Sequence, residues 1–185
     1  IKYLFAVWRG TNHSPKAIYQ FLKYNTFNEI IHGNVLIPAS HVVIQLEKGG
    51  KIIKKGISYI GTKRYRKSKL ETRLLIEKGG ILELGPNTNI MYGADIGATV
   101  ICGEKIEIGK GTMMGRNVLI RDNNGDHYIN RTGYKNTRPV VIGEKAWLCE
   151  GCTIMLGVNI GDGAIVGAKA FVTSNIPPNT MVSGN

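Results

Sequence analysis

The sequence has few acidic residues and no long apolar run. Its 185 residues include 13 Asp and Glu against 24 Lys and Arg, which leaves a net charge of +11. No apolar stretch approaches the roughly 18 residues that span a bilayer. Because 43% of the residues are hydrophobic and only 20% are charged, the composition indicates a folded chain rather than a disordered one. The length suits one domain with a sizeable core.

Cysteine is also scarce. Three cysteines are an odd number for a chain of this length, which argues against a secreted scaffold held together by disulfides. The same count favours a reducing compartment. We therefore expect the protein to be cytoplasmic.

Glycine is abundant, with 24 residues, and an apolar residue recurs every six positions through the second half of the chain. The series is Leu84, Ile90, Ile96, Cys102, Ile108, Met114 and Ile120, and then Ile142, Leu148, Ile154, Ile160, Val166 and Val172. Glycine follows many members of the series, and the position two residues before each member is small, β-branched or apolar. A helix would instead place apolar residues three and four apart.

A short strand with two inward residues, followed by a tight turn, fits this period of six. Three such strands close a triangular coil, and successive coils stack as parallel strands whose inward residues form ladders. The sequence therefore predicts an all-β chain, a parallel β-helix built from hexapeptides.

Two similar segments mark the start of the coils. Residues 46–50 (LEKGG) and 76–80 (IEKGG) lie 30 positions apart, a multiple of six. We therefore expect a β-helix domain over 44–185, preceded by a cap segment over 1–43 that contains a short helix shielding the first open coil edge.

We expect two loops to leave the β-helix, at about 55–73 and at 121–139. The first contains the basic stretch 63–69 (KRYRKSK). The second separates Ile120 from Ile142, where the series jumps instead of advancing by six, and this insertion of roughly 16 residues is longer than most loops. The inserted segment is polar and outside the repeat, as is typical of a functional loop on a rigid scaffold. It holds His127, whereas the other three histidines precede the repeat.

The loop 122–127 (DNNGDH), the repeats over 141–172 and the closing stretch 176–185 resemble the hexapeptide-repeat acyltransferases. The resemblance implies a left-handed β-helix, a homotrimer with active sites between subunits, and acetyl-CoA as acyl donor. Residues 17–24 (AIYQFLKY) and the basic loop look more like the subgroup that O-acetylates bacterial surface polysaccharides or their sugar precursors. We therefore expect an acetyl-CoA-dependent O-acetyltransferase acting on a sugar or polysaccharide hydroxyl, with no metal required.

An acyl transfer to a hydroxyl needs a base, and imidazole, with a pKa near 6.5, suits this task at neutral pH. His127 is the candidate general base. Asp122, Asp126 or a backbone carbonyl could fix its tautomer. Turn backbone N–H groups are the expected donors to the oxyanion, and the resemblance implies direct transfer without an acyl-enzyme.

The resemblance also implies binding residues. Trp147, expected to face outward at a coil corner, would line the acceptor cleft together with Asp126. The positions that correspond to the family's contacts with CoA are Glu150, Ala168, Thr173 and Ser174, with Lys169 as a nearby cation. Glu150 and Ser174 depart from the residue types usual in the family, and Ser174 has no positive charge for the phosphate contact.

The cysteine pair and the basic loop also allow other interpretations. Cys149 and Cys152 form a CxxC, which we interpret as structural because Cys152 takes an inward position and no second ligand pair accompanies it. The basic loop suits a solvated surface, steering of CoA or an acidic glycan, or contact with anionic lipid where a membrane-linked glycan is made. We expect no nucleic-acid binding, because the basic residues lack interleaved aromatic platforms.

Three rival functions remain to be compared with O-acetylation. The acceptor could instead be an amino-sugar amine, serine or an antibiotic. A β-helix carbonic anhydrase would need three histidines on adjacent coils, which the repeat region lacks. A non-catalytic scaffold would repeat one outward residue type, whereas the outward positions here vary.

Overall fold

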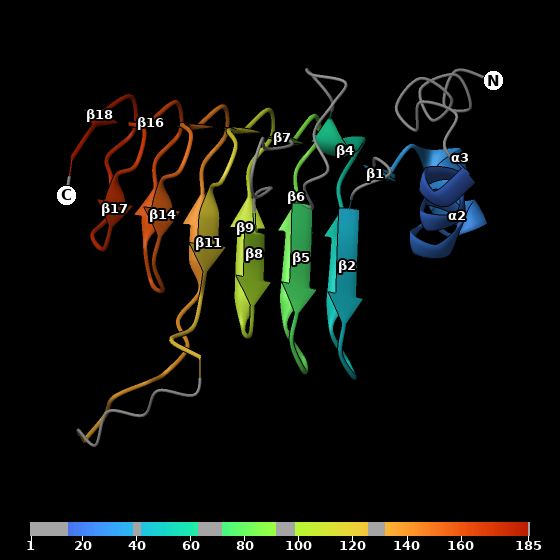
Figure 1. Ribbon diagram of the computed structural model, residues 1–185, viewed down its shortest axis with the longest axis horizontal. Helices are drawn as coiled ribbons and strands as arrows, with labels where there is room; N and C mark the ends of the chain where they lie inside the picture. Colours follow the sequence, from blue (N-terminus) through green and yellow to red (C-terminus); the bar gives the residue numbers. More distant parts are fainter. Residues whose placement is uncertain (1–14, 39–41, 63–71, 92–98, 126–131, 185) are drawn as a thin grey trace.

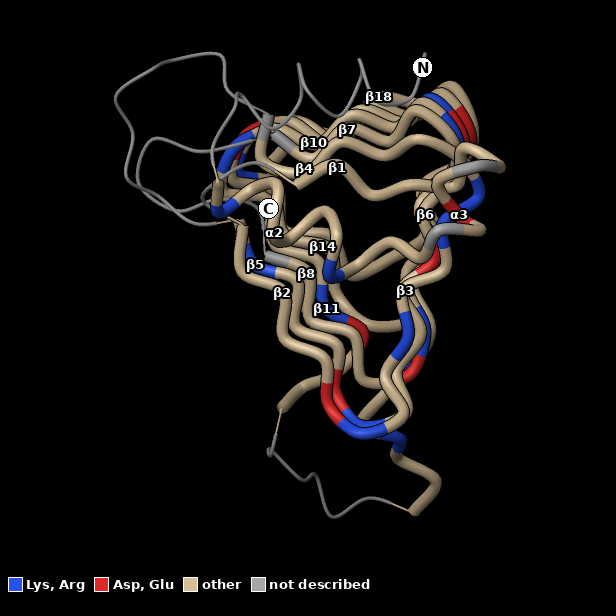
Figure 2. Tube along the Cα trace, turned by 90° about the vertical axis from the view of Figure 1, so that its right-hand side faces the viewer, with Lys and Arg blue, Asp and Glu red and all other residues tan. Residues whose placement is uncertain are grey.

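The computed structural model describes residues 15–38, 42–62, 72–91, 99–125 and 132–184. In these residues the chain winds through three parallel sheets that enclose one core, and two short helices lie at the end where the coils begin (Figure 1). This is the parallel β-helix that the repeat predicted, of the left-handed kind that the resemblance implied. The view along the coils shows their triangular outline (Figure 2).

Each coil contributes one strand to each of three faces of the prism. The seven-stranded face contains β1 (Leu36–Pro38), β4 (Ser58–Thr62), β7 (Asn89–Met91), β10 (Met113–Met114), β13 (Trp147–Leu148), β16 (Ile165–Val166) and β18 (Met181–Val182). The six-stranded face contains β2 (Val42–Leu46), β5 (Thr72–Ile76), β8 (Thr99–Cys102), β11 (Leu119–Arg121), β14 (Thr153–Ile154) and β17 (Phe171–Val172). The five-stranded face contains β3 (Lys51–Lys54), β6 (Ile81–Leu84), β9 (Lys105–Ile108), β12 (Val140–Ile142) and β15 (Asn159–Ile160).

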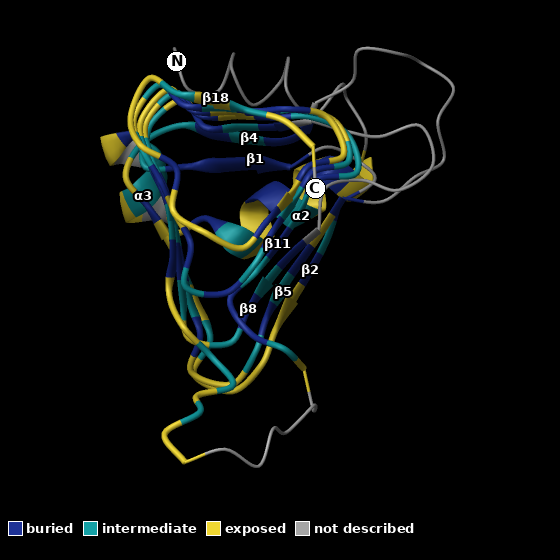
Figure 3. Ribbon diagram, turned by 90° about the vertical axis from the view of Figure 1, so that its left-hand side faces the viewer, coloured by how far each residue is buried: buried dark blue, intermediate teal, exposed yellow. Residues whose placement is uncertain are grey.

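The inward positions of the repeat are the core, as the sequence predicted. In the strand around β13, Ala146 and Leu148 have no exposed surface, whereas Trp147 between them is exposed. Buried residues recur in the other coils (Figure 3), and their side chains form one core cluster inside the prism. Full burial of a side chain such as Leu148 contributes about 2 kcal/mol to stability.

The two halves of the β-helix differ in coil length. Leu148 pairs with Val166 on the next coil, so a coil in the second half is three hexapeptides long. Near the other end, Ile44 pairs with Leu74, and one coil there takes the length of five hexapeptides. The similar segments 46–50 and 76–80 are therefore one coil apart, and their spacing reflects a single long coil rather than a run of hexapeptide strands. The strands of these first coils are correspondingly longer (Figure 1).

The helical cap consists of α2 (Pro15–Tyr24) and α3 (Phe27–His32). A capping box between Thr26 and Glu29 begins α3, and its C-cap is left-handed. The Lys54 ammonium, buried in the β-helix, contacts the Glu29 carboxylate at 2.7 Å and donates to the Tyr24 carbonyl at 2.6 Å. These contacts join the cap to the coils. The strand series itself begins at Leu36, ahead of the start near Ile44 expected from the repeat.

Glycines at the corners serve two different needs. A Cβ added to Gly109 would lie 2.5 Å from the carbonyl carbon of Gly143 in the next coil, so this position needs glycine for close backbone approach. Two residues later Gly111 has a left-handed φ of 69°, and Lys145, at the aligned position of the next coil, has a φ of 53°. Only the second position accepts a side chain, because a Cβ there would make an ordinary contact with the Lys145 Cγ at 3.6 Å.

Replacing Gly109 with alanine should therefore destabilise the protein more than replacing Gly111 with asparagine. We expect G109A to lower the free energy of unfolding by about 2–3 kcal/mol, because the methyl group overlaps fixed backbone. G111N is the matched control and should lose less than about 1 kcal/mol, since asparagine tolerates the left-handed region. Urea denaturation measures both, and equal losses would contradict the proposed role of the close approach.

Candidate active site

The inserted loop leaves the prism at the corner between the six-stranded and five-stranded faces. Ile120 in β11 still pairs with Ile154 in β14 on the next coil, although the insertion lies between them in the sequence. The insertion therefore changes neither the register nor the inward positions. The described residues of the returning half of the loop, 132–137, lie away from the body of the coils (Figures 1 and 3). His127 and Asp126, the candidate base and its neighbour, lie outside the described residues.

Asp122 is the first residue after β11 and has no exposed surface. Its Oδ1 accepts a hydrogen bond from the Gly103 N–H and its Oδ2 accepts one from the Glu104 N–H, both at 2.7 Å. Hydrogen bonds to a carboxylate are stronger than those between neutral groups. Asp122 therefore closes the turn of the preceding coil and fixes the point where the loop starts. Its predicted contact with His127 stays a prediction.

Asn123 continues this buried stem and is 3% exposed. Its side-chain amide donates to the Glu77 carboxylate at 3.3 Å and to Asp122 at 3.2 Å, while its Oδ1 accepts from the Gly125 N–H at 2.9 Å. The Arg121 Nε donates to the Asn123 carbonyl at 2.6 Å. These bonds determine the path of the chain up to two residues before His127.

The two ends of the loop also bind each other. Asn124 donates through its side chain to the Tyr134 hydroxyl at 2.5 Å and through its backbone to the Asn136 carbonyl at 3.1 Å. The Asn136 side chain donates to the Gly125 carbonyl. These four residues form a clasp, through which the chain enters and leaves the segment that carries His127.

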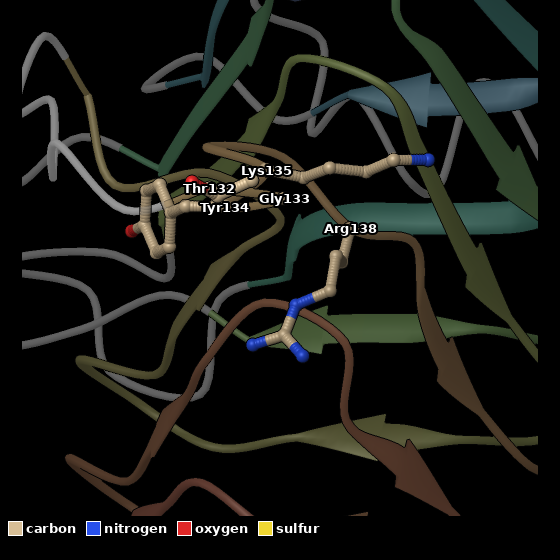
Figure 4. A pocket seen from close by; sticks show the side chains of 5 residues that line it. All are labelled: Thr132, Gly133, Tyr134, Lys135 and Arg138. Carbon is tan, nitrogen blue, oxygen red and sulfur yellow. The ribbon is translucent and has the colours of Figure 1, made fainter.

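A pocket of about 440 Å³ lies on the returning half of the loop. Thr132, Gly133, Tyr134, Lys135 and Arg138 line it, and the three longer side chains extend in different directions around it (Figure 4). No acidic residue is among these five lining residues. The pocket therefore presents two cations and two hydroxyl groups beside the clasp.

Trp147 lies within strand β13 rather than at a coil corner, and its side chain faces outward as expected. It is 47% exposed and pairs in register with Met113, which is 49% exposed, and with Ile165. Met181, on the following strand, is exposed as well. Trp147 is thus part of an apolar ladder on the outside of the seven-stranded face.

Three of the residues predicted to bind CoA share one corner, between the seven-stranded and six-stranded faces. Glu150 and Lys169 join adjacent coils there through a backbone hydrogen bond of 2.9 Å, and Ala168 and Lys169 are both exposed. The Glu150 carboxylate accepts two hydrogen bonds from the Arg116 guanidinium, at 2.6 and 3.1 Å. Glu150 is therefore neutralised by Arg116, which leaves Lys169 as the exposed cation of this trio.

Thr173 and Ser174 lie at the other edge of the six-stranded face. They follow β17, are exposed, and share the corner from which the inserted loop departs in an earlier coil. The structure thus places the five predicted CoA contacts in two groups at opposite ends of strand β17, with Phe171 exposed between them.

The CxxC cysteines have no catalytic environment in the described part of the chain. Cys152 is fully buried, and burial raises the pKa of its thiol to about 12. Burial also raises the pKa of the half-buried Cys149 thiol. Cys102, another inward residue, has its pKa raised to about 12 by burial and by the Asp122 carboxylate. These thiols stay protonated at neutral pH, whereas the thiolate is the nucleophile and metal ligand.

The described residues contain no group of three or more His, Cys, Asp and Glu that could hold a metal ion. Nor do they include a helix long and apolar enough to cross a membrane. Sequence reasoning did not single out Glu77, the clasp partner Tyr134 or the pocket residues Lys135 and Arg138. Glu77 is far from Asn123 in the sequence, and nothing in the local pattern signals that contact.

No family model matches the chain. Among curated proteins, it is 25% identical over 142 residues to the galactoside O-acetyltransferase of Escherichia coli strain K12, a match that covers 76% of this chain and 66% of that relative. The chain thus spans less than two thirds of the length of this relative.

Solved structures share the fold. The polySia-specific acetyltransferase NeuO has a TM-score of 0.57 at 24% identity, over 81% of this chain and 68% of that one. A hexapeptide-repeat acetyltransferase from Vibrio cholerae O1 biovar eltor, solved with acetyl-CoA, has a TM-score of 0.55 at 17% identity, over 99% and 81% of the two chains. The resemblance to the hexapeptide-repeat acyltransferases is confirmed by the sequence similarity to the galactoside O-acetyltransferase and by the shared fold.

Replacing Asp122 with asparagine tests its role in the stem. An amide offers one acceptor oxygen instead of two, so one of the Gly103 and Glu104 N–H groups loses its partner. We expect D122N to lower the free energy of unfolding by about 1–3 kcal/mol in urea denaturation at pH 7. D162N is the matched control, because Asp162 accepts a hydrogen bond from only one exposed backbone N–H, that of Glu144. The D162N variant should therefore lose less stability than D122N. Unchanged stability together with lost activity would instead indicate that Asp122 acts by fixing the tautomer of His127.

Proposed function

We propose that the protein is an acetyl-CoA-dependent O-acetyltransferase that acts on a sugar or polysaccharide hydroxyl. The observation that carries this proposal is the similarity, over three quarters of the chain, to a galactoside O-acetyltransferase. The fold it shares with the Vibrio cholerae acetyltransferase solved with acetyl-CoA supports the same donor. The structural likeness to NeuO supports a saccharide polymer as acceptor.

In the proposed reaction, His127 takes the proton of the acceptor hydroxyl as the oxygen attacks the thioester carbonyl carbon. Backbone N–H groups stabilise the resulting oxyanion. The carbon–sulfur bond then breaks, and the sulfur receives the proton from the imidazolium to leave as the CoA thiol. The acetyl group passes directly to the acceptor. The Asn123 stem and the clasp fix the two points between which the segment that carries His127 is held, and this supports a transfer that depends on a positioned base.

We assign the remaining predicted residues to binding. Trp147 and Asp126 contact the acceptor, with Asp126, Asp122 or a backbone carbonyl fixing the tautomer of the base. The two groups of CoA residues frame the six-stranded face, so the donor would lie between Lys169 at one edge and Thr173 and Ser174 at the other. The ion pair between Glu150 and Arg116 favours a structural role for Glu150, at the corner between the seven-stranded and six-stranded faces.

The outer faces support a homotrimer. Apolar side chains are exposed on the seven-stranded face, at Met113, Trp147 and Met181, and on the six-stranded face at Phe171. The five-stranded face has the exposed Ile53, but its outward positions also carry charged residues, including the ion pair of Lys105 with Glu107. Exposed apolar faces are typical of surfaces buried in an assembly. We propose that the first two faces meet neighbouring subunits and that the charged face meets solvent.

The general-base assignment predicts a specific loss of activity. H127A should lower kcat by about a hundred- to ten-thousandfold, and wild-type kcat/KM should rise with pH through the region of a histidine pKa, near 6.5. Release of the CoA thiol, followed with a panel of sugars, glucosamine, serine and chloramphenicol as acceptors, measures both effects.

The matched control is H32A, because His32 is exposed on the cap helix α3 and should not affect transfer. Mild alkali cleaves the ester product of O-acetylation but leaves an amide intact, which separates the hydroxyl acceptors from the amine alternative. Full activity of H127A would overturn the assignment of the base.

The trimer proposal predicts a particle of about three times the 20.3 kDa chain in light scattering. M113E should dissociate it, because a buried charge at an apolar contact is costly. K51E is the matched control on the five-stranded face and should remain a trimer. A stable wild-type monomer at micromolar concentration would contradict this assembly.

A further inference from the structure

The pocket on the returning half of the loop contains two cations without an acidic partner among the described residues. Other arginines at these corners are occupied, since Arg116 binds Glu150 and Arg121 donates to the Asn123 carbonyl. Arg138 and Lys135 have no such contact with a described residue, although both line the same cavity. Two positive charges beside a cavity of about 440 Å³ favour an anionic ligand there.

Arg138 is held in position by the coil beneath it. Its backbone N–H donates to the Asp122 carbonyl at 2.8 Å, and its carbonyl accepts from the Gly157 N–H at 3.2 Å. The guanidinium lies against Gly157, where an added Cβ would be only 3.1 Å from the Arg138 Nε. Glycine at 157 therefore makes room for the guanidinium, and the fork of Arg138 suits a carboxylate, which it can bind through two parallel hydrogen bonds.

The remaining lining residues suit a sugar rather than an isolated ion. Thr132 and Tyr134 add hydroxyl groups that can bind sugar hydroxyls, and Tyr134 adds an aromatic ring. Figure 4 shows Lys135 and Arg138 extending on different sides of the pocket. Such an arrangement can bind a carboxylate at one point and a pyranose ring beside it.

We propose that this pocket binds the carboxylate of an acidic sugar unit and so directs the enzyme to anionic glycans. The inference rests on the proposed function, because it names the acceptor class of that reaction. Phosphates of CoA share the same anionic chemistry, and Arg138 lies at the corner that Thr173 and Ser174 occupy in a later coil. The glycan is favoured because Thr132, Tyr134 and Lys135 belong to the projecting loop rather than to the face proposed for the donor.

Calorimetric titration of the intact protein with trigalacturonic acid, a sialic acid trimer, and the methyl esters of both tests the proposal. The esters keep the hydroxyl groups and lose the negative charge. We expect the wild type to bind at least one acid, and to bind its ester about tenfold more weakly. R138Q and K135Q should each weaken binding of the acid by about three- to tenfold and leave the ester unchanged.

K16Q, which removes an exposed lysine on the cap helix, is the matched control and should behave as the wild type. Equal affinity for acid and ester, no binding of either acid, or unchanged binding by R138Q would each overturn the proposal. So would an R138Q variant that weakens CoA but not dephospho-CoA, since the pocket would then serve the donor. Failure of the proposed function is separate, because it would appear as absent acetyl-CoA binding in the wild type while acid binding persisted.

Discussion

The interior of the prism is the constraint on which the rest of the structure depends. Most strands turn two side chains inward, and backbone hydrogen bonds keep successive coils in parallel register. Because the interior is narrow, small residues such as Ala146 and Ala164 accompany larger ones such as Leu148. The same tight stacking brings the corners of adjacent coils together, and positions such as Gly109 then accept no side chain.

Because the core fills the interior of the prism, functional side chains lie on its surface. The ladders occupy the inward positions, so differences between the three faces arise only from outward residues. Exposed apolar side chains include Met113, Trp147 and Met181 on the seven-stranded face and Phe171 on the six-stranded face. The five-stranded face carries the Lys105–Glu107 ion pair and the exposed Ile53. The corners are where the chain can leave without breaking a ladder, and the inserted loop does so without shifting the pairing of Ile120 with Ile154.

A long insertion needs its own support, which the stem and the clasp provide. Asp122 and Asn123 connect the start of the loop to backbone and side chains of earlier coils, including Glu77. The clasp then joins the outgoing and returning halves. Since Arg138 also bonds to the Asp122 backbone, the same contacts that define the approach to His127 position the basic pocket.

The sequence by itself determined the period, the inward residues and the place and size of the insertion, because burial of two side chains per strand leaves a direct mark at every sixth position. It also singled out His127, through its isolation in a polar loop. The long first coils and the mid-strand position of Trp147 could not be read from that pattern. Only the tertiary structure paired Glu150 with Arg116 and Asn123 with Glu77, because these contacts join residues far apart in the chain that meet only when the coils stack.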